Sequence, residues 1–388
     1  MSSSLYRRTT AFCPAVRVRS LPMCVAAFAL IVVILLMAWR STNQIPGPPP
    51  HQNDDSPSAS PTATIHTFDS YRRASNQAIA AGESPPSPLR ICLVTLQLAG
   101  LTQNSGMGVA VASLATALAS AGHAVSILYA ATPRADWPLW RAHYAALGVE
   151  LAVLPAADTR LWPTGRSHRV RIAWQCYQWL RERQVALDLV YFHDWHGIGY
   201  YATQAKRQGL DFARTLLSTI MHCPVSFFRH GNSQHAAKIT TLLADHMESN
   251  QVRSSDLVIS PSRFMLDWVV RERGWTLPTG AGRVFVQPNV LSVEVLAAIP
   301  LAEERDRNQV IHADEYVFFG RLETLKGLDT FVDALDWLAT MLPSERRCGL
   351  IWTREGKLFP FTQFLLLYSI PESKSHFSAK SIRAARWK

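Results

Sequence analysis

Short apolar runs alternate along this chain with longer segments that carry apolar residues at helical spacing. Residues 91–96 (ICLVTL) and 124–129 (AVSILY) are apolar and β-prone, which predicts two strands. Residues 109–121 between them are rich in alanine and leucine, and Gly122 follows where a glycine commonly ends a helix. A strand, a helix and a strand in this order predict a βαβ unit with parallel strands.

Four further apolar runs predict strands, and polar residues stand at their carboxyl ends. We expect these strands at residues 188–192, 215–221, 256–259 and 284–287. His193 follows the first of them, His222 follows the second, and Ser262 lies where it can cap a helix after the third. Ligands bind at the carboxyl edge of open parallel sheets, so we expect a binding site there.

The segment NSGMG, residues 104–108, predicts a turn between the first strand and the helix that follows it. Gly106 and Gly108 lack side chains, so a ligand can approach the backbone closely and reach the N–H groups at the start of the helix. The third glycine of the dinucleotide-binding fingerprint is absent, and the loop from strand to helix is long. Both features argue against a standard NAD site.

A second strand–loop–helix pattern appears in FFGRLETLKGLDTF, residues 318–331. The strand ends at Gly320, and Gly327 opens the helix. The loop between them carries Arg321 and Lys326. Two cations beside a helix N-terminus suit a diphosphate, since arginine donates forked hydrogen bonds and lysine adds a point charge. An ordinary connection with two surface cations is the alternative interpretation of this segment alone.

Taken in order from about residue 89 to about residue 340, these segments resemble the retaining glycosyltransferases of the GT-B fold. This large group, glycosyltransferase families 4 and 5, includes glycogen and starch synthases and many bacterial sugar transferases. The matching motifs are the GMG turn, HDWHG at 193–197, STIMHCP at 218–224, SPSRFMLDW at 260–268, QPN at 287–289 and GRLETLKGLD at 320–329. The resemblance implies an α/β protein with one complete Rossmann-like domain at residues 89–295 and a second, partial one at 296–388.

The resemblance also implies an activity: transfer of a sugar from a nucleoside diphosphate sugar to a glycan or another acceptor, with retention and without a metal or other cofactor. His222 and His193 are then the candidate catalytic residues. His222 is expected at the donor sugar near the reacting carbon, whereas His193 is expected to organise the loop at the cleft. Arg321 and Lys326 are expected to bind the diphosphate and stabilise the leaving group. The glycines of the GMG turn are expected in the donor site.

Each of these assignments has an alternative. A histidine after a strand is most often hydrogen-bonded within the fold and has no catalytic role. The histidines of HDWHG, residues 193–197, could suggest a metal site, but no third ligand is evident and we expect no metal. A nucleotide-sugar epimerase or dehydrogenase is disfavoured because neither Tyr144 nor Tyr177 has a lysine four positions on, as a Tyr-x-x-x-Lys pair requires.

The second domain departs from the family pattern. The family's later glutamate motif, which grips the ribose and sugar of the donor, is absent from this sequence, as is the glycine-rich loop before it. About 70 residues follow Tyr316, and they include an apolar block at 359–370 and a basic polar tail. We therefore expect an incomplete donor site, through truncation, alternative splicing or a frameshift. A catalytically inactive remnant that binds a glycan or a protein partner is the alternative function.

The amino-terminal pattern predicts a membrane anchor. Residues 1–20 contain four arginines and no acid, and residues 21–39 form an apolar run of 19 residues, long enough to span a bilayer. The flanking arginines favour a cytosolic amino terminus, hence a type II protein that faces the lumen of the Golgi or ER. A signal peptide, or a transit peptide for a plastid or another organelle, is the alternative. Residues 40–88, dense in proline and serine, predict an extended, disordered linker.

The net charge of +10 does not indicate nucleic-acid binding. The excess lies partly in the two terminal segments and partly across residues 160–280, without the clustered patch and the motif that nucleic-acid recognition requires. The six cysteines show no spacing typical of zinc or of a disulfide framework.

Overall fold

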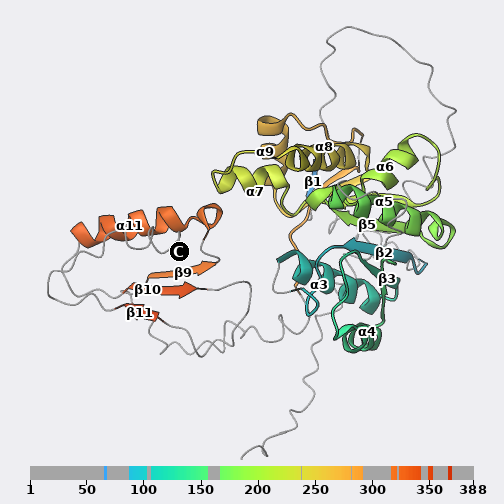
Figure 1. The fold of residues 1–388 in the computed structure, drawn as a ribbon, viewed down its shortest axis with the longest axis horizontal. Coiled ribbons are helices and arrows are strands. Elements are labelled where there is room, and N and C mark those ends of the chain that lie inside the picture. Colours follow the sequence, from blue (N-terminus) through green and yellow to red (C-terminus); the bar gives the residue numbers. More distant parts are fainter. Residues whose placement is uncertain are drawn as a thin grey trace, which may run out of the picture.

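The computed structural model contains two groups of elements, one built on a large parallel sheet and one on a small sheet (Figure 1). The described residues are 65–67, 87–102, 106–155, 167–236, 238–280, 282–291, 316–320, 323–341, 348–352 and 366–368. The predicted basic tail and membrane span lie outside them, as does most of the predicted linker. Among the helices that are described, none is long and apolar enough to cross a bilayer.

The large sheet has eight strands in the order β1-β8-β7-β6-β5-β2-β3-β4, and all neighbours are parallel. In chain order these are β1 (Ile65–Thr67), β2 (Arg90–Thr95), β3 (Ala124–Tyr129), β4 (Val149–Val153), β5 (Leu189–His193), β6 (Leu216–Ile220), β7 (Leu257–Ser260) and β8 (Val284–Val286). From β2 the chain builds outward to β4 and then returns beside β2 with β5. The order reverses there, and the crevice at such a switch point is where ligands bind.

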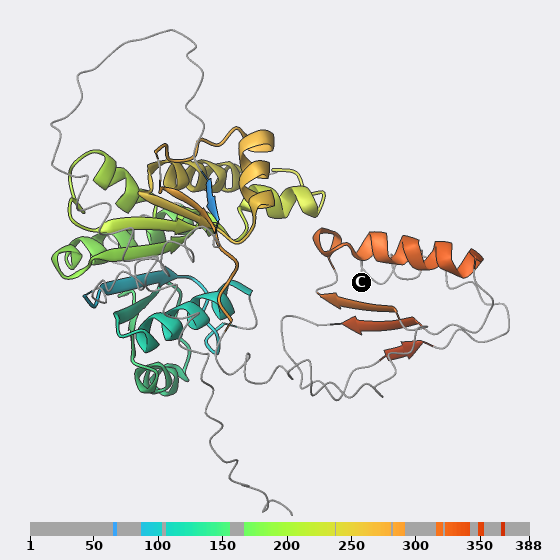
Figure 2. The same cartoon turned by 180° about the vertical axis from the view of Figure 1, so that it is seen from behind.

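Helices cover both faces of the large sheet (Figures 1 and 2). In β2, Ile91 belongs to a core cluster shared with the helices α3 and α4, whereas the next residue, Cys92, belongs to a cluster shared with α5 and α6. Because both faces are buried, the strands are nearly continuous apolar runs. The helices are α3 (Gly106–Ser120), α4 (Trp137–Ala146), α5 (His168–Arg181), α6 (Tyr200–Arg207), α7 (Val225–Gly231), α8 (Ile239–Ser254) and α9 (Arg263–Arg273), with the short 3₁₀ turns η1 (Gln184–Ala186) and η2 (Trp195–Gly197).

The six strands predicted from apolar runs in residues 91–287 are confirmed, each to within one residue at either end. Ser262 is the N-cap of α9, as expected, and its hydroxyl accepts a hydrogen bond from the Met265 N–H at 3.3 Å. Gly122 lies just beyond the end of α3 with a φ of +89°, a left-handed conformation that glycine adopts without steric cost.

Two expectations about local structure were wrong. Gly106 and Gly108 do not form a turn but lie in the first turn of α3. A Cβ at Gly108 would lie 3.1 Å from the backbone of Leu98, so this glycine lets the helix begin directly against the preceding loop. Residues Ile65–Thr67 of the predicted linker form β1, which pairs in parallel with β8. The edge of β8 offers unpaired N–H and C=O groups, to which an extended segment can add.

The small sheet has the order β11-β10-β9, with β9 (Tyr316–Gly320) and β10 (Cys348–Trp352) parallel and β11 (Leu366–Tyr368) antiparallel to β10. A 3₁₀ turn, η3 (Thr324–Lys326), leads into α11 (Leu328–Met341). Phe318 packs against Leu328 and Val332 of this helix. The predicted strand–loop–helix segment is therefore confirmed as β9, η3 and α11.

Candidate functional site

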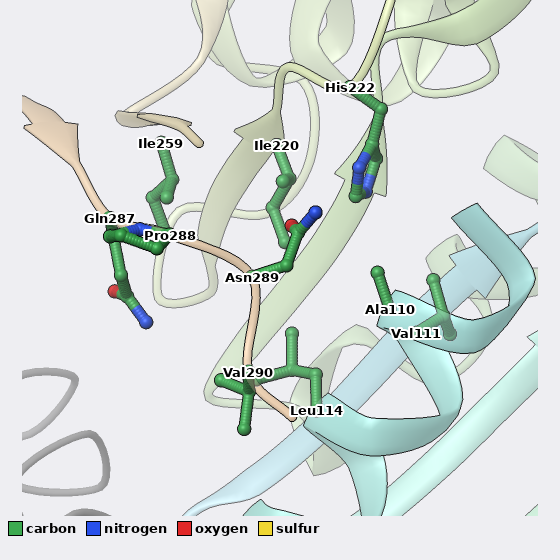
Figure 3. A pocket seen from close by; sticks show the side chains of 10 residues that line it. All are labelled: Ala110, Val111, Leu114, Ile220, His222, Ile259, Gln287, Pro288, Asn289 and Val290. Atoms are coloured by element: carbon green, nitrogen blue, oxygen red, sulfur yellow. The ribbon is translucent and has the colours of Figure 1, made fainter. Parts of the chain in front are cut away.

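A small cavity of about 30 Å³ lies at the carboxyl edge of the large sheet. Its lining comes from the first turns of α3, the ends of β6 and β7, and the segment that follows β8 (Figure 3). Most of the lining is apolar. The polar side chains at the cavity are those of His222, Gln287 and Asn289. The site therefore lies at the edge where the sequence predicted a ligand, close to the switch point of the sheet.

His222 is half-buried two residues beyond the end of β6. In Figure 3 its ring and the Asn289 amide point toward each other across the cavity. Burial lowers the pKa of His222 to about 4. The imidazole is therefore neutral near pH 7, with one nitrogen that can donate a hydrogen bond and one that can accept.

His193 lies beneath the site and does not line the cavity. It is the last residue of β5, and its side chain is 2 % exposed. Its Nε2 accepts a hydrogen bond from the Leu96 N–H at 3.1 Å, and Nδ1 has no hydrogen-bond partner among the described atoms. Burial, then the neighbouring His222 and His196, lower the pKa of His193 to about 3. The neutral ring thus fixes the loop that follows β2.

The loop of residues 193–199 is held by side chains from α8 that the sequence analysis did not single out. Glu248 and Gln251 of α8 are fully buried. The Gln251 amide accepts a hydrogen bond from the Gly199 N–H at 2.7 Å and donates one to the His193 carbonyl at 3.0 Å. Both residues stand on the buried face of this helix, beside Ala244 and Met247.

Two buried carboxylates connect this loop to the His222 segment. Asp194 accepts hydrogen bonds from the His222 N–H at 2.9 Å and from the Cys223 N–H at 3.2 Å. Glu248 accepts from the His196 N–H at 2.7 Å and from the Val225 N–H at 2.9 Å. Burial raises the pKa of Asp194 to about 7. Burial and the nearby Asp194 raise the pKa of Glu248 well above its usual range.

The predicted donor-site glycines lie at the start of α3. Gly106 is exposed, and no atom of the described residues stands within 4 Å of where its Cβ would be. Gly108 is buried, and its carbonyl accepts a hydrogen bond from the Ala99 N–H at 3.2 Å. Gly106 therefore leaves open space at the helix N-terminus, whereas Gly108 packs against the backbone of Leu98.

The predicted cations belong to the second group of elements. Lys326 is exposed at the end of η3, and Arg321 lies outside the described residues. The neighbouring Leu325 N–H donates a hydrogen bond to Asn232 Oδ1 at 3.2 Å, and Asn232 is the C-cap of α7. Lys326 thus lies close to the helix that follows His222. Within the described part of the chain, no group of three histidine, cysteine or acidic side chains is arranged to hold a metal.

Several solved structures are similar to this chain. UGT2 from Phytolacca americana is 14 % identical, with a TM-score of 0.36, 55 % of this chain and 56 % of that chain covered. A UDP-glucosyltransferase from Polygonum tinctorium is 11 % identical, with a TM-score of 0.36 and 56 % of each chain covered. A UGT transferase from Siraitia grosvenorii is 10 % identical, with a TM-score of 0.31 and 52 % of each chain covered.

The chain spans about half the length of these solved structures. No curated protein matches it. Residues 104–294, however, match the family model described as Glycosyltransferase Family 4. The match covers the start of α3, the STIMHCP motif and the segment after β8, which all contribute to the cavity, and it also covers the HDWHG motif. It confirms the resemblance to a GT-B glycosyltransferase found in the sequence, and residues 104–294 are the part of the chain that matches this family.

Proposed function

We propose that this chain transfers a sugar from a nucleoside diphosphate sugar to a glycan or another acceptor, with retention of the anomeric configuration. The observation that carries the proposal is the neutral His222 imidazole at the carboxyl-edge cavity of a family 4 domain. A neutral ring can hydrogen-bond a sugar hydroxyl, and it adds no positive charge beside the cationic carbon that develops when the donor bond breaks.

The donor bond to break joins the anomeric carbon to the diphosphate oxygen. Lys326, together with Arg321, would stabilise the negative charge that this oxygen takes up as it leaves. The acceptor hydroxyl would then bond to the same face of the anomeric carbon, and its proton would pass to the departing phosphate oxygen. Gly106, at the open N-terminus of α3, would let the donor approach the backbone closely.

Calorimetric titration of residues 88–388 with UDP, ADP and GDP and their glucose conjugates tests the donor site. We expect one nucleotide to bind, and we expect Lys326→Ala to weaken it by about tenfold or more, the loss of a charge-assisted contact. His222→Ala should leave nucleotide affinity nearly unchanged and lower the rate of transfer. Equal losses of binding and transfer in His222→Ala would mean that this histidine is structural. Nucleotide binding without transfer to any acceptor would favour a binding module.

We further propose that residues 21–39 anchor the chain in the membrane of the Golgi or ER, with the family 4 domain in the lumen. The proposal rests on the arginines before an apolar run long enough to span a bilayer. Protease treatment of sealed microsomes checks it: the domain should be protected until detergent opens the vesicles. Digestion before detergent, or import into plastids, would contradict it.

A further inference from the structure

The segment between β6 and α7 carries His222, and buried side chains accept hydrogen bonds from its backbone N–H groups. Pro224 has no N–H. The remaining N–H groups of residues 222–225, those of His222, Cys223 and Val225, all donate to the carboxylates of Asp194 or Glu248. These three N–H groups therefore make no hydrogen bond within a helix or between strands. Its path depends on two side chains, one from the loop after β5 and one from α8.

Glu248 is the member of this pair that joins separate parts of the chain. One of its carboxylate oxygens accepts from His196, in the loop after β5, and the other accepts from Val225, at the start of α7. α8 packs closely against this loop, since a Cβ at Gly197 would lie 2.5 Å from the Met247 Cβ. A rigid helix therefore carries an acid that sets the distance between the two loops of the site.

Burying two neighbouring acids is unfavourable, and apolar side chains of similar size would avoid that cost. Asp194 and Glu248 are both fully buried, and a negative charge on Asp194 disfavours the ionisation of Glu248. The two acids instead accept hydrogen bonds from four backbone N–H groups, each in a defined direction. These hydrogen bonds restrict the backbone that carries His222, and catalysis requires such a side chain to be held within a fraction of an ångström.

We propose that Glu248 is a positioning residue which, together with Asp194, holds His222 in its orientation at the cavity. The proposal deepens the transferase function proposed above and rests on it only for its catalytic consequence. Without Glu248, the segment of residues 222–225 would lose its tie to α8, and the His222 ring would move out of its half-buried place into water.

The first test uses the unaltered chain. Hydrogen exchange should show the amides of His196, His222 and Val225 protected to the same degree as those of β6, although His222 lies outside any helix or strand. Rapid exchange of His222 and Val225 in the folded chain would overturn the proposal, whatever any variant does.

The second test replaces the acids by amides. In Glu248→Gln and Asp194→Asn, one acceptor oxygen remains and an NH₂ group faces the other backbone N–H. NMR of a chain with labelled histidines would follow the titration of His222, assigned with His222→Ala. We expect its pKa to rise from about 4 toward its ordinary value, by about one pH unit or more, as burial is lost. An unchanged titration in folded Glu248→Gln would overturn the proposal.

Asp256→Asn is the matched control. Asp256 also accepts a backbone hydrogen bond, from the Leu217 N–H at 2.8 Å, and pairs with Lys206, but at the amino edge of the sheet. This variant should leave the His222 titration unchanged. If the transferase function holds, Glu248→Gln should also lower kcat by about tenfold to a hundredfold with little change in donor KM. A shifted His222 titration in a chain without transferase activity would uphold the positioning role and refute the proposed function.

Discussion

Gly197 occupies a position that no residue with a side chain fits. Its φ is +62°, and a Cβ would lie 2.5 Å from the Met247 Cβ and 2.8 Å from the Met247 backbone carbon. Gly197→Ala therefore combines left-handed strain with a clash against the backbone of α8. We expect it to lower the free energy of unfolding by about 3 kcal/mol, measured by urea denaturation.

Gly122→Ala is the control for backbone strain alone. Gly122 has a φ of +89°, but nothing lies within 4 Å of a Cβ built there. We expect a loss of about 1 kcal/mol, from the conformation only. Equal losses at positions 122 and 197 would contradict the close packing of the loop against α8.

His193 gives a prediction with a defined dependence on pH. Its pKa of about 3 in the fold lies below the ordinary value of about 6.5 that the unfolded chain restores. The unfolded state therefore binds more protons between these values, and the stabilisation present above pH 6.5 is lost as the pH falls toward 3. His193→Gln removes this effect, whereas the neighbouring groups titrate in both proteins.

The measurement is urea denaturation of both proteins at pH 8 and pH 5. The stability advantage of the unaltered chain over His193→Gln should be smaller at pH 5 by about 2 kcal/mol. A difference between the two proteins that stays the same at both pH values would mean that His193 is not held neutral by burial.

At the scale of single elements, the N-cap of α9 can be tested against a natural counterpart. Ser262 Oγ accepts the Met265 N–H at 3.3 Å, whereas Ser167, the N-cap of α5, makes no such bond. Ser262→Ala should therefore cost about 1 kcal/mol in urea denaturation, and Ser167→Ala should cost much less. The cap assignment fails if the two substitutions have equal effects.

The strands and their terminal polar residues could be predicted from the sequence because each depends on a short local pattern. An apolar run gives the strand, and the residue that follows it must stand at the carboxyl edge, as His193 and His222 do. The first turn of α3 could not be placed in the same way. Gly108 suits a turn by its residue type, and its place in the helix depends on contact with Leu98.

The role of α8 could not be predicted because it depends on contacts far apart in the sequence. Glu248 and Gln251 follow Ala244 and Met247 on one buried face. In the sequence alone, Glu248 and Gln251 would be assigned to the exposed face of the helix, because both are polar. Their partners, at positions 193–199, lie about 50 residues away, and these side chains acquire a function only when the sheet brings that loop against the helix.

At the scale of the whole molecule, the hydrophobic cores of the two groups of elements are separate. Three clusters of buried apolar residues lie within residues 89–290, and the fourth, around Phe318, lies within the small sheet and α11. Among the described residues, no cluster contains members from both groups. The large sheet, with helices on both faces, therefore has the features of an independently stable domain.

We therefore expect residues 87–291 alone to unfold in one cooperative step in urea. Phe192→Ala in the same fragment is the control that shows whether the fragment has the native core. Phe192 is 1 % exposed, and its truncation should lower the free energy of unfolding by about 3–5 kcal/mol. A matched fragment that begins at residue 60 adds β1, and the difference between the two measures what that edge strand contributes. A fragment without a cooperative transition would show that the sheet depends on contacts outside it, such as the one between Asn232 and Leu325.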